Sequence, residues 1–180
     1  MKAAFQSCWT PAEGGGEPQV RLTANLSAAE LSLDNLAWRK PPGKEARLEF
    51  EIAKGQTHKT ELQNFKLVGE NIAADGWLAI GADQRLKEFY FPEFTINLVS
   101  QLEIRGALRS DNVWDVKAKG VRYDGRDMFR SLFSLGQISE KQAPPPKGNI
   151  GVDLSAEIET VIGFTETSVR KVTVELKKRM

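Results

Sequence analysis

The 180-residue sequence has little of the chemistry that identifies an enzyme or a metal protein. Its one cysteine, Cys8, excludes an internal disulfide and leaves no second thiol for a metal site. The one histidine, His58, lies in the polar stretch 54–59, which is typical of a hairpin turn and has no Cys, Asp or Glu spaced as a metal ligand. The Gly-x-Ser-x-Gly, P-loop, His-Glu-x-x-His and Cys-x-x-Cys motifs are also missing. We therefore predict no enzyme, and no catalytic, cofactor-binding or metal-binding residues.

An excess of one charge and long hydrophobic runs are missing as well. The 25 Lys and Arg balance 24 Asp and Glu, so no strong field attracts nucleic acid, and we expect no nucleic-acid partner. Neither a signal-peptide core nor about 18 consecutive apolar residues occurs. Val172, Val174 and Leu176 still alternate close to the last residue, as in a segment excised from a longer chain. Any membrane anchor would then lie outside this sequence.

Two-residue alternation is what the sequence has in abundance. Between 46 and 52 every even position is apolar and the odd positions are charged, and the same rhythm returns at 94–98, 102–108 and 114–118. This pattern predicts strands with one buried side. Antiparallel sheets often have one apolar and one polar face. The question of function is therefore what covers the apolar face.

Turn signals divide the sequence into a series of predicted strands. They cover 20–26, one or two strands within 31–38, 46–52, 59–68, 71–81, 87–91, 94–99, 101–109, 112–122, 151–159 and 169–177. One segment changes period, because Met128, Phe129, Leu132 and Phe133 lie on one helical stripe after a capping residue, Asp124. We predict a mainly β fold, an antiparallel sheet with one short amphipathic helix near 124–135.

A faint internal period accompanies the strands. Some residue pairs recur at a spacing of 29 residues, either through the regular length of a β-hairpin or as a stacked repeat that would give an elongated, open-ended sheet. The recurring pairs are Asn35-Leu36, Asn64-Phe65 and Glu93-Phe94, and Leu48 and Phe50 recur as Trp77 and Ala79. The run 89–92 is also unusual, because adjacent aromatic residues point to opposite faces of a strand. Tyr90 is thus either a binding residue or an edge residue.

Three stretches together resemble the AsmA-like envelope proteins of Gram-negative bacteria, in particular the YhdP-like branch with its domain of unknown function. The stretch 36–43 is similar to the family's Trp-x-Lys-x-x-Gly turn, here Trp38, Lys40 and Gly43. The stretch 123–127 resembles its Asp-x-Arg helix start, and 152–179 is similar to the block that begins the next β-layer. These motifs are short and structural, and none is a catalytic signature.

The resemblance implies a long curved sheet, taco-like or an open-ended half-barrel, on the periplasmic side of the inner membrane. It implies a role in moving phospholipid between the inner and outer membranes. The chain would then divide into an irregular segment 1–19, the sheet and helix at 20–142, a Pro-rich linker 143–148, and the truncated start of the next β-layer at 149–180. The rest of the full-length chain would be its neighbour.

Two hypotheses follow for the apolar face, and an enzyme ranks last. In the first, the face forms a lipid groove for phospholipid acyl chains. The expected lining residues are Leu48, Phe50, Ile52, Phe94, Ile96, Leu98, Leu102, Ile104 and Val116. In the second, the domain is a scaffolding module of the cell envelope that acts through protein contacts. Unpaired edge strands near residues 20 and 177 would pair with missing neighbours or form an edge-strand dimer.

Overall fold

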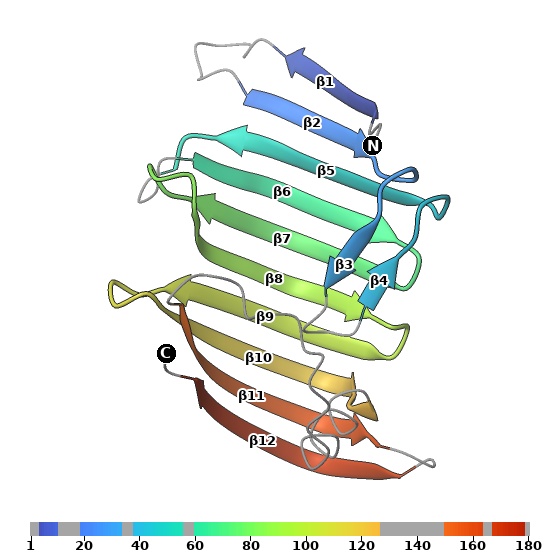
Figure 1. The fold of residues 1–180 in the computed structure, drawn as a ribbon, viewed down its shortest axis with the longest axis vertical. Helices are drawn as coiled ribbons and strands as arrows, with labels where there is room; N and C mark the ends of the chain where they lie inside the picture. The colour runs from blue at the N-terminus through green and yellow to red at the C-terminus, as the bar shows by residue number, and fades with distance from the viewer. Residues whose placement is uncertain are drawn as a thin grey trace, which may run out of the picture.

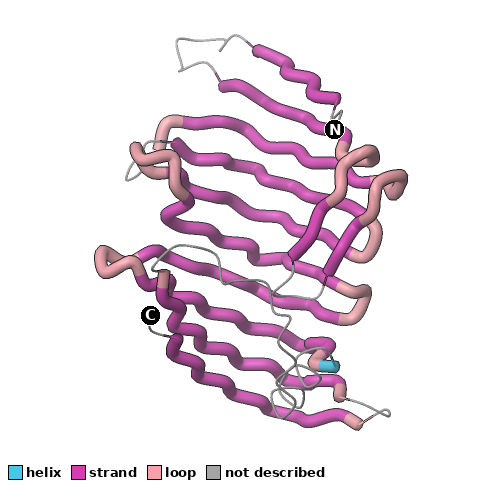
Figure 2. The backbone as a smooth tube through the Cα atoms, in the orientation of Figure 1, coloured by secondary structure: helices cyan, strands magenta, loops and turns pink. Residues whose placement is uncertain are grey.

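Ten strands form one open sheet in the computed structural model (Figure 1). The structure describes residues 4–10, 19–33, 38–55, 60–126, 150–163 and 167–178. In order across the sheet the strands are β1 (Ala4–Thr10), β2 (Gln19–Asn25), β5 (Ala46–Ala53), β6 (Thr60–Gly69), β7 (Ile72–Ile80), β8 (Leu86–Ile96), β9 (Ser100–Leu108), β10 (Val113–Asp124), β11 (Gly151–Ile162) and β12 (Ser168–Lys178). A separate hairpin consists of β3 (Leu31–Leu33) and β4 (Trp38–Lys40). Figure 2 shows that strands and turns make up almost all of the described chain.

The mainly β prediction is confirmed, and all but one pair of neighbouring strands are antiparallel. The exception is β10 with β11, which run parallel from the Val113↔Gly151 pair to the Asp124↔Ile162 pair. A parallel pair needs a crossover of about a dozen or more residues, and the segment 125–150 is long enough to supply it. The strands β11 and β12 therefore extend the same sheet, whereas the sequence predicted the start of a new layer.

Other boundaries also differ from the prediction. The N-terminal segment expected to be irregular contains β1, which pairs with β2 along its whole length. The strands predicted at 87–91 and 94–99 are a single strand, β8, with Pro92 at a bulge. Asp124 is the last residue of β10, and nearly all of the predicted helix and the linker 143–148 lie outside the described residues. No helix in the described ranges is long and apolar enough to cross a membrane.

The register gives the sheet one apolar and one polar face. Cross-strand partners such as Leu22↔Phe50, Leu62↔Leu78 and Phe94↔Leu102 place apolar side chains on one side of every strand from β2 onward. The alternate positions carry partners such as Arg21↔Glu51 and Lys119↔Glu157 on the other side. We call these two sides the apolar face and the polar face.

A row of backbone irregularities crosses the sheet from β6 to β12. β6 has extra residues between Leu62 and Phe65, β8 has them between Phe91 and Phe94, and the register of β10 shifts between Gly120 and Arg122. In β11 and β12 the regular pairs skip Glu159 and Lys171, and Lys171 has a positive φ of 55°. Because a bulge bends its strand, the aligned bulges bend the sheet along one line. The sheet stays open, with β1 and β12 at its two ends.

The β3–β4 hairpin packs on the apolar face near the ends of β6, β7 and β8 (Figure 1). Trp38 is only 5% exposed and joins a core cluster that contains Ile72 and Phe94. The Lys40 ammonium is also buried, and it donates to the carbonyl oxygens of Ser27, Pro41 and Lys44 at 3.3, 3.1 and 2.8 Å. Gly43 adopts a positive φ of 91°, which glycine reaches without steric cost. The Trp-x-Lys-x-x-Gly stretch is thus a packed turn whose charge is fully hydrogen-bonded.

Candidate functional site: the apolar face

Eight of the nine residues predicted to line a groove lie on the apolar face. Leu48, Phe50 and Ile52 come from β5, Phe94 and Ile96 from β8, Leu102 and Ile104 from β9, and Val116 from β10. The register brings them together through cross-strand pairs that include Phe94↔Leu102 on adjacent strands, and Ile104↔Ala118 beside Val116. The alternation in the sequence was therefore a correct guide to the shared face of these eight side chains.

The ninth residue, Leu98, is a wrong assignment. It lies in the turn between β8 and β9 and is 76% exposed. Asn97 and Leu98 both have positive φ, 55° and 61°, so the extended backbone ends at Ile96 and the even-position rule ends with it. Leu98 is part of a turn and does not belong to the apolar face.

Burial divides the eight residues into two groups. Phe94, Ile96 and Leu102 are buried, at 7%, 1% and 9% exposure, in the core cluster that includes Trp38 of the hairpin. The other five are half-buried: Leu48, Phe50, Ile52, Ile104 and Val116. A ligand on the apolar face would therefore contact the second group, whereas the first group supports the fold.

Aromatic rings cross the apolar face in a chain that the predicted list largely missed. Phe50 stacks on Phe65 at 6.3 Å, and Phe65 meets Phe91 edge-on at 5.5 Å. Phe91 contacts Phe89 at 6.0 Å, and Phe89 contacts Trp114 at 5.5 Å. We call these five residues the aromatic row. It runs from β5 to β10, and all of its members except the buried Phe91 are half-buried.

Two glycines make room for this row. A Cβ on Gly106 would lie 2.5 Å from ring atoms of Phe89, and a Cβ on Gly76 would lie 2.9 Å from Phe91 and 2.0 Å from the Tyr90 carbonyl oxygen. Each ring therefore lies directly over a backbone that has no side chain. Glycine within a predicted strand is a known signal for such close approach, so these positions could have been found in the sequence.

Charged groups of the sheet gather on the polar face. The Arg21 guanidinium donates to the Glu51 carboxylate, which also accepts from Asn64 at 2.7 Å, and together these bonds lower the pKa of Glu51. Lys119 pairs with Glu157 at 3.5 Å. The segregation leaves the half-buried part of the apolar face without an ion pair in the described residues. Its surface is suited to hydrocarbon.

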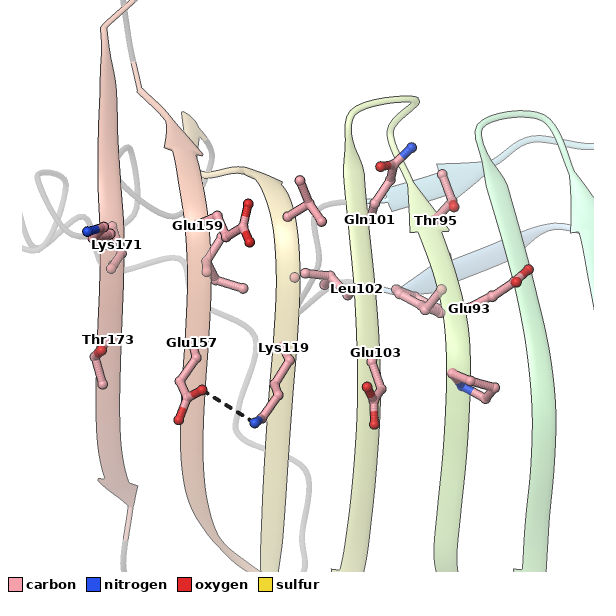
Figure 3. A pocket seen from close by; sticks show the side chains of 16 residues that line it. Glu93, Thr95, Gln101, Leu102, Glu103, Lys119, Glu157, Glu159, Lys171 and Thr173 are labelled. Carbon is pink, nitrogen blue, oxygen red and sulfur yellow. Dashed lines mark ion pairs between the residues drawn. The ribbon is translucent and has the colours of Figure 1, made fainter.

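The polar face is hollowed where the bulges cross it. A groove of about 800 Å³ runs over β8 to β12, and its lining includes Pro92, Glu93, Val121, Glu159 and Lys171, all from the bulged positions. Figure 3 shows Glu157, Lys119 and Glu103 in a row across β11, β10 and β9 within this groove. No group of three or more His, Cys, Asp and Glu in the described ranges could hold a metal ion. His58 lies outside those ranges.

Comparisons with known proteins add no relative to this description. No protein-family model, no curated protein and no solved structure matches the chain.

Proposed function

We propose that this chain is a non-catalytic, lipid-binding segment of an AsmA-like, YhdP-like envelope protein, on the periplasmic side of the inner membrane of a Gram-negative bacterium. In this proposal phospholipid acyl chains lie on the apolar face during transport between the inner and outer membranes. The rest of the full-length chain, including an inner-membrane anchor, would continue beyond this segment. The resemblance in the sequence suggests the family, and the geometry of the apolar face supports the ligand.

One observation carries the proposal. The apolar side chains form a continuous surface over nine strands, from β2 to β12, and the aromatic row on it is half-exposed. Single exposed apolar residues are ordinary, whereas a large contiguous apolar surface indicates a binding partner. The β3–β4 hairpin covers only the region around Trp38. Each acyl methylene buried on the remaining surface would contribute about 0.8 kcal/mol.

The alternative is a scaffolding module, which the two open edges of the sheet favour. Among the described strands β12 pairs only with β11, and its apolar residues Val169 and Leu176 are 53% and 49% exposed. An unpaired edge strand can accept a strand from another protein, or from a second copy in an edge-strand dimer. In that case the apolar face would contact protein and carry no lipid.

Lipid extraction from the purified chain distinguishes the two functions. The chain is expressed in a Gram-negative host, purified without detergent, and its co-purified lipid is quantified by mass spectrometry. We expect phospholipid with the wild type, and a loss of most of it after Phe50→Gln and Trp114→Gln, which change half-buried rings of the apolar face. The matched control is Trp77→Gln with Tyr90→Gln, which removes two rings from the polar face and should leave the lipid in place.

Circular dichroism must show that both variants remain folded. A folded wild type that carries no lipid would contradict the lipid-binding function, and so would equal loss of lipid from both variants.

A further inference from the structure

Two cations of the polar face lie directly opposite each other. Arg105 of β9 and Lys117 of β10 are cross-strand partners, and both side chains are exposed. Like charges placed directly opposite in a sheet repel and destabilise it. Neither residue forms an ion pair within the described residues, whereas the nearby Lys119 pairs with Glu157 and Arg109 pairs with Asp153. The neighbouring strand adds a hydroxyl, because Ser155 is the partner of Lys117.

On the polar face, two aromatic residues follow Arg105 in the same line across the strands. Tyr90 is the cross-strand partner of Arg105, and Trp77 is the partner of Tyr90. Both rings are half-buried on the polar face, away from the aromatic row. Tyr90 is hydrogen-bonded to Glu103, which fixes its ring, and desolvation together with the Glu103 charge raises the Tyr90 pKa. Because β8 lies between β7 and β9, Tyr90 is in the middle of the sheet. This excludes the edge position considered for it.

These residues surround a hollow of about 340 Å³, within the size range of small-ligand sites. Its floor includes Ala107, whose small side chain lies on the polar face and leaves space above β9. Its lining consists of Trp77, Glu88, Phe89, Tyr90, Glu103, Arg105, Gly106, Ala107, Asp115 and Lys117. Glu103 also lines the larger groove in Figure 3, so the two hollows adjoin. The walls thus combine aromatic rings, two cations and three carboxylates.

We propose that this hollow binds an acidic sugar, a saccharide unit that carries a phosphate or carboxylate group. The acid group would lie between Arg105 and Lys117, where an anion relieves their repulsion and accepts charge-assisted hydrogen bonds. The C–H face of the sugar ring would pack on Trp77 and Tyr90, because aromatic faces carry negative charge density and attract polarised C–H groups. The ring hydroxyls would donate to the carboxylates of Glu88 and Asp115.

Simpler ligands use only part of this lining. An inorganic anion would contact the two cations and leave the aromatic rings unused. A neutral sugar would use the rings and carboxylates and leave the Arg105–Lys117 repulsion in place. The acidic sugar is the ligand that engages all three kinds of side chain.

A two-dimensional NMR titration of the whole chain tests the proposal. The probes are glucose 6-phosphate and glucuronate, with glucose and inorganic phosphate as comparisons, and the readouts are the Trp77 indole N–H and the backbone amides of Arg105 and Lys117. We expect saturable shifts with both acidic sugars, and weaker binding of glucose and of phosphate alone. Arg105→Ala with Lys117→Ala should weaken glucose 6-phosphate binding by at least about tenfold, the loss expected for two charged hydrogen bonds. Trp77→Ala should weaken it as well.

The matched control is Lys66→Ala, which removes an exposed cation from the polar face of β6, outside the hollow. It should leave binding unchanged. The double variant without ligand should unfold at a temperature equal to or above that of the wild type, because a repulsion is removed. No saturable shift with either acidic sugar would overturn the proposal, and so would phosphate binding as tight as glucose 6-phosphate binding. Shifts at these residues only with another protein would assign the hollow to a protein interface and overturn it too.

Discussion

Glycine residues decide where the rings of the apolar face lie. Gly76 and Gly106 each sit beneath a phenylalanine, and Gly120 similarly faces Leu102, with a Cβ position only 2.5 Å from a Leu102 methyl group. Large side chains on one strand thus lie opposite glycines on the neighbouring strand. This arrangement lets bulky residues of adjacent strands share one face, and it makes the face sensitive to single added methyl groups.

Gly106→Val tests this packing. The new side chain would overlap the Phe89 ring, so the ring must move and its contact with Trp114 must change. We expect a loss of about 1–3 kcal/mol in the free energy of unfolding, measured by urea denaturation. Ala107→Val is the matched control, because Ala107 is exposed on the other face and should tolerate the change. Equal stability of the two variants would contradict the close packing of Phe89 on Gly106.

Lys40 is a second residue whose role is structural. Its buried ammonium is the hydrogen-bond donor to three turn carbonyls, so Lys40→Met would leave buried acceptors without a donor. We expect a loss of about 1–3 kcal/mol in unfolding free energy. Arg39→Met serves as the control, since Arg39 is exposed and makes a surface pair with Glu30. A variant as stable as this control would show that the turn does not depend on the ammonium.

Acid sensitivity follows from Glu51. Its pKa in the folded chain is lowered from 4.5, mainly by the hydrogen bond from Arg21 and then by that from Asn64. A lowered folded pKa stabilises the fold above the ordinary value, and this contribution disappears as the pH falls through the lowered value. Glu51→Gln should therefore reduce the loss of stability that occurs as the pH falls below 4.5. Parallel pH profiles for wild type and variant, recorded by thermal unfolding, would contradict this role.

The strand β11 is held at its start by contacts with the turn that precedes β10. The parallel strand β11 begins beside the β9–β10 turn, where the Gly151 N–H donates to the Asn112 carbonyl at 3.0 Å. Arg109 holds the same corner, because it donates to Asp153 of β11 at 2.9 Å and also to Asp111 within the turn. Arg109 lowers the pKa of Asp111. The start of β11 is therefore attached to the preceding hairpin by both backbone and side chain.

Arg109→Met should loosen β11 without unfolding the sheet. We expect faster hydrogen exchange at the first amides of β11, because the variant loses the Arg109–Asp153 pair, which connects the turn to the strand. Lys119→Met is the control, since Lys119 joins β10 to β11 through one exposed pair at 3.5 Å and should change exchange little. Equal protection of β11 in the two variants would show that Arg109 does not hold this strand.

The strands were predictable where the alternation was regular, and the pairing was not. The apolar even positions of 46–52 and 102–108 correctly place Phe50 and Ile104 on one face. Alternation is a local signal, so it could not reveal that β11 pairs in parallel with β10 or that β1 pairs with β2. It also misled at Leu98, because the rhythm continues in the sequence after the backbone turns at Asn97.

Part of the 29-residue period in the sequence corresponds to the positions of bulges in the structure. Asn64-Phe65 and Glu93-Phe94 both lie at bulges, in β6 and β8, which are separated by one strand, β7. Trp77 and Ala79 do not match Leu48 and Phe50, because they lie on the polar face. The period thus follows the length of a bulged hairpin in this region, and the remaining pair, Asn35-Leu36, lies outside the described residues. A bulge shifts the register by inserting a residue, which alternation alone does not predict.

The whole molecule is an open, two-faced sheet. Its apolar face carries the aromatic row, its polar face carries the ion pairs and hollows, and the row of bulges bends both. Under the two proposals above, hydrocarbon and charged ligands would bind on opposite sides of this single layer. In the proposed lipid-binding function, acyl chains would contact the apolar face and leave the polar face free.

Fluorine NMR of the 5-fluorotryptophan-labelled chain tests this claim most directly, because Trp114 lies on the apolar face and Trp77 on the polar face. The resonances are assigned with Trp77→Phe and Trp114→Phe, and a phospholipid with a nitroxide on its acyl chain is then added. We expect strong broadening of the Trp114 signal and little change at Trp77, reversed when ascorbate reduces the nitroxide. Equal broadening of both signals, or broadening of Trp77 alone, would contradict a lipid-binding apolar face.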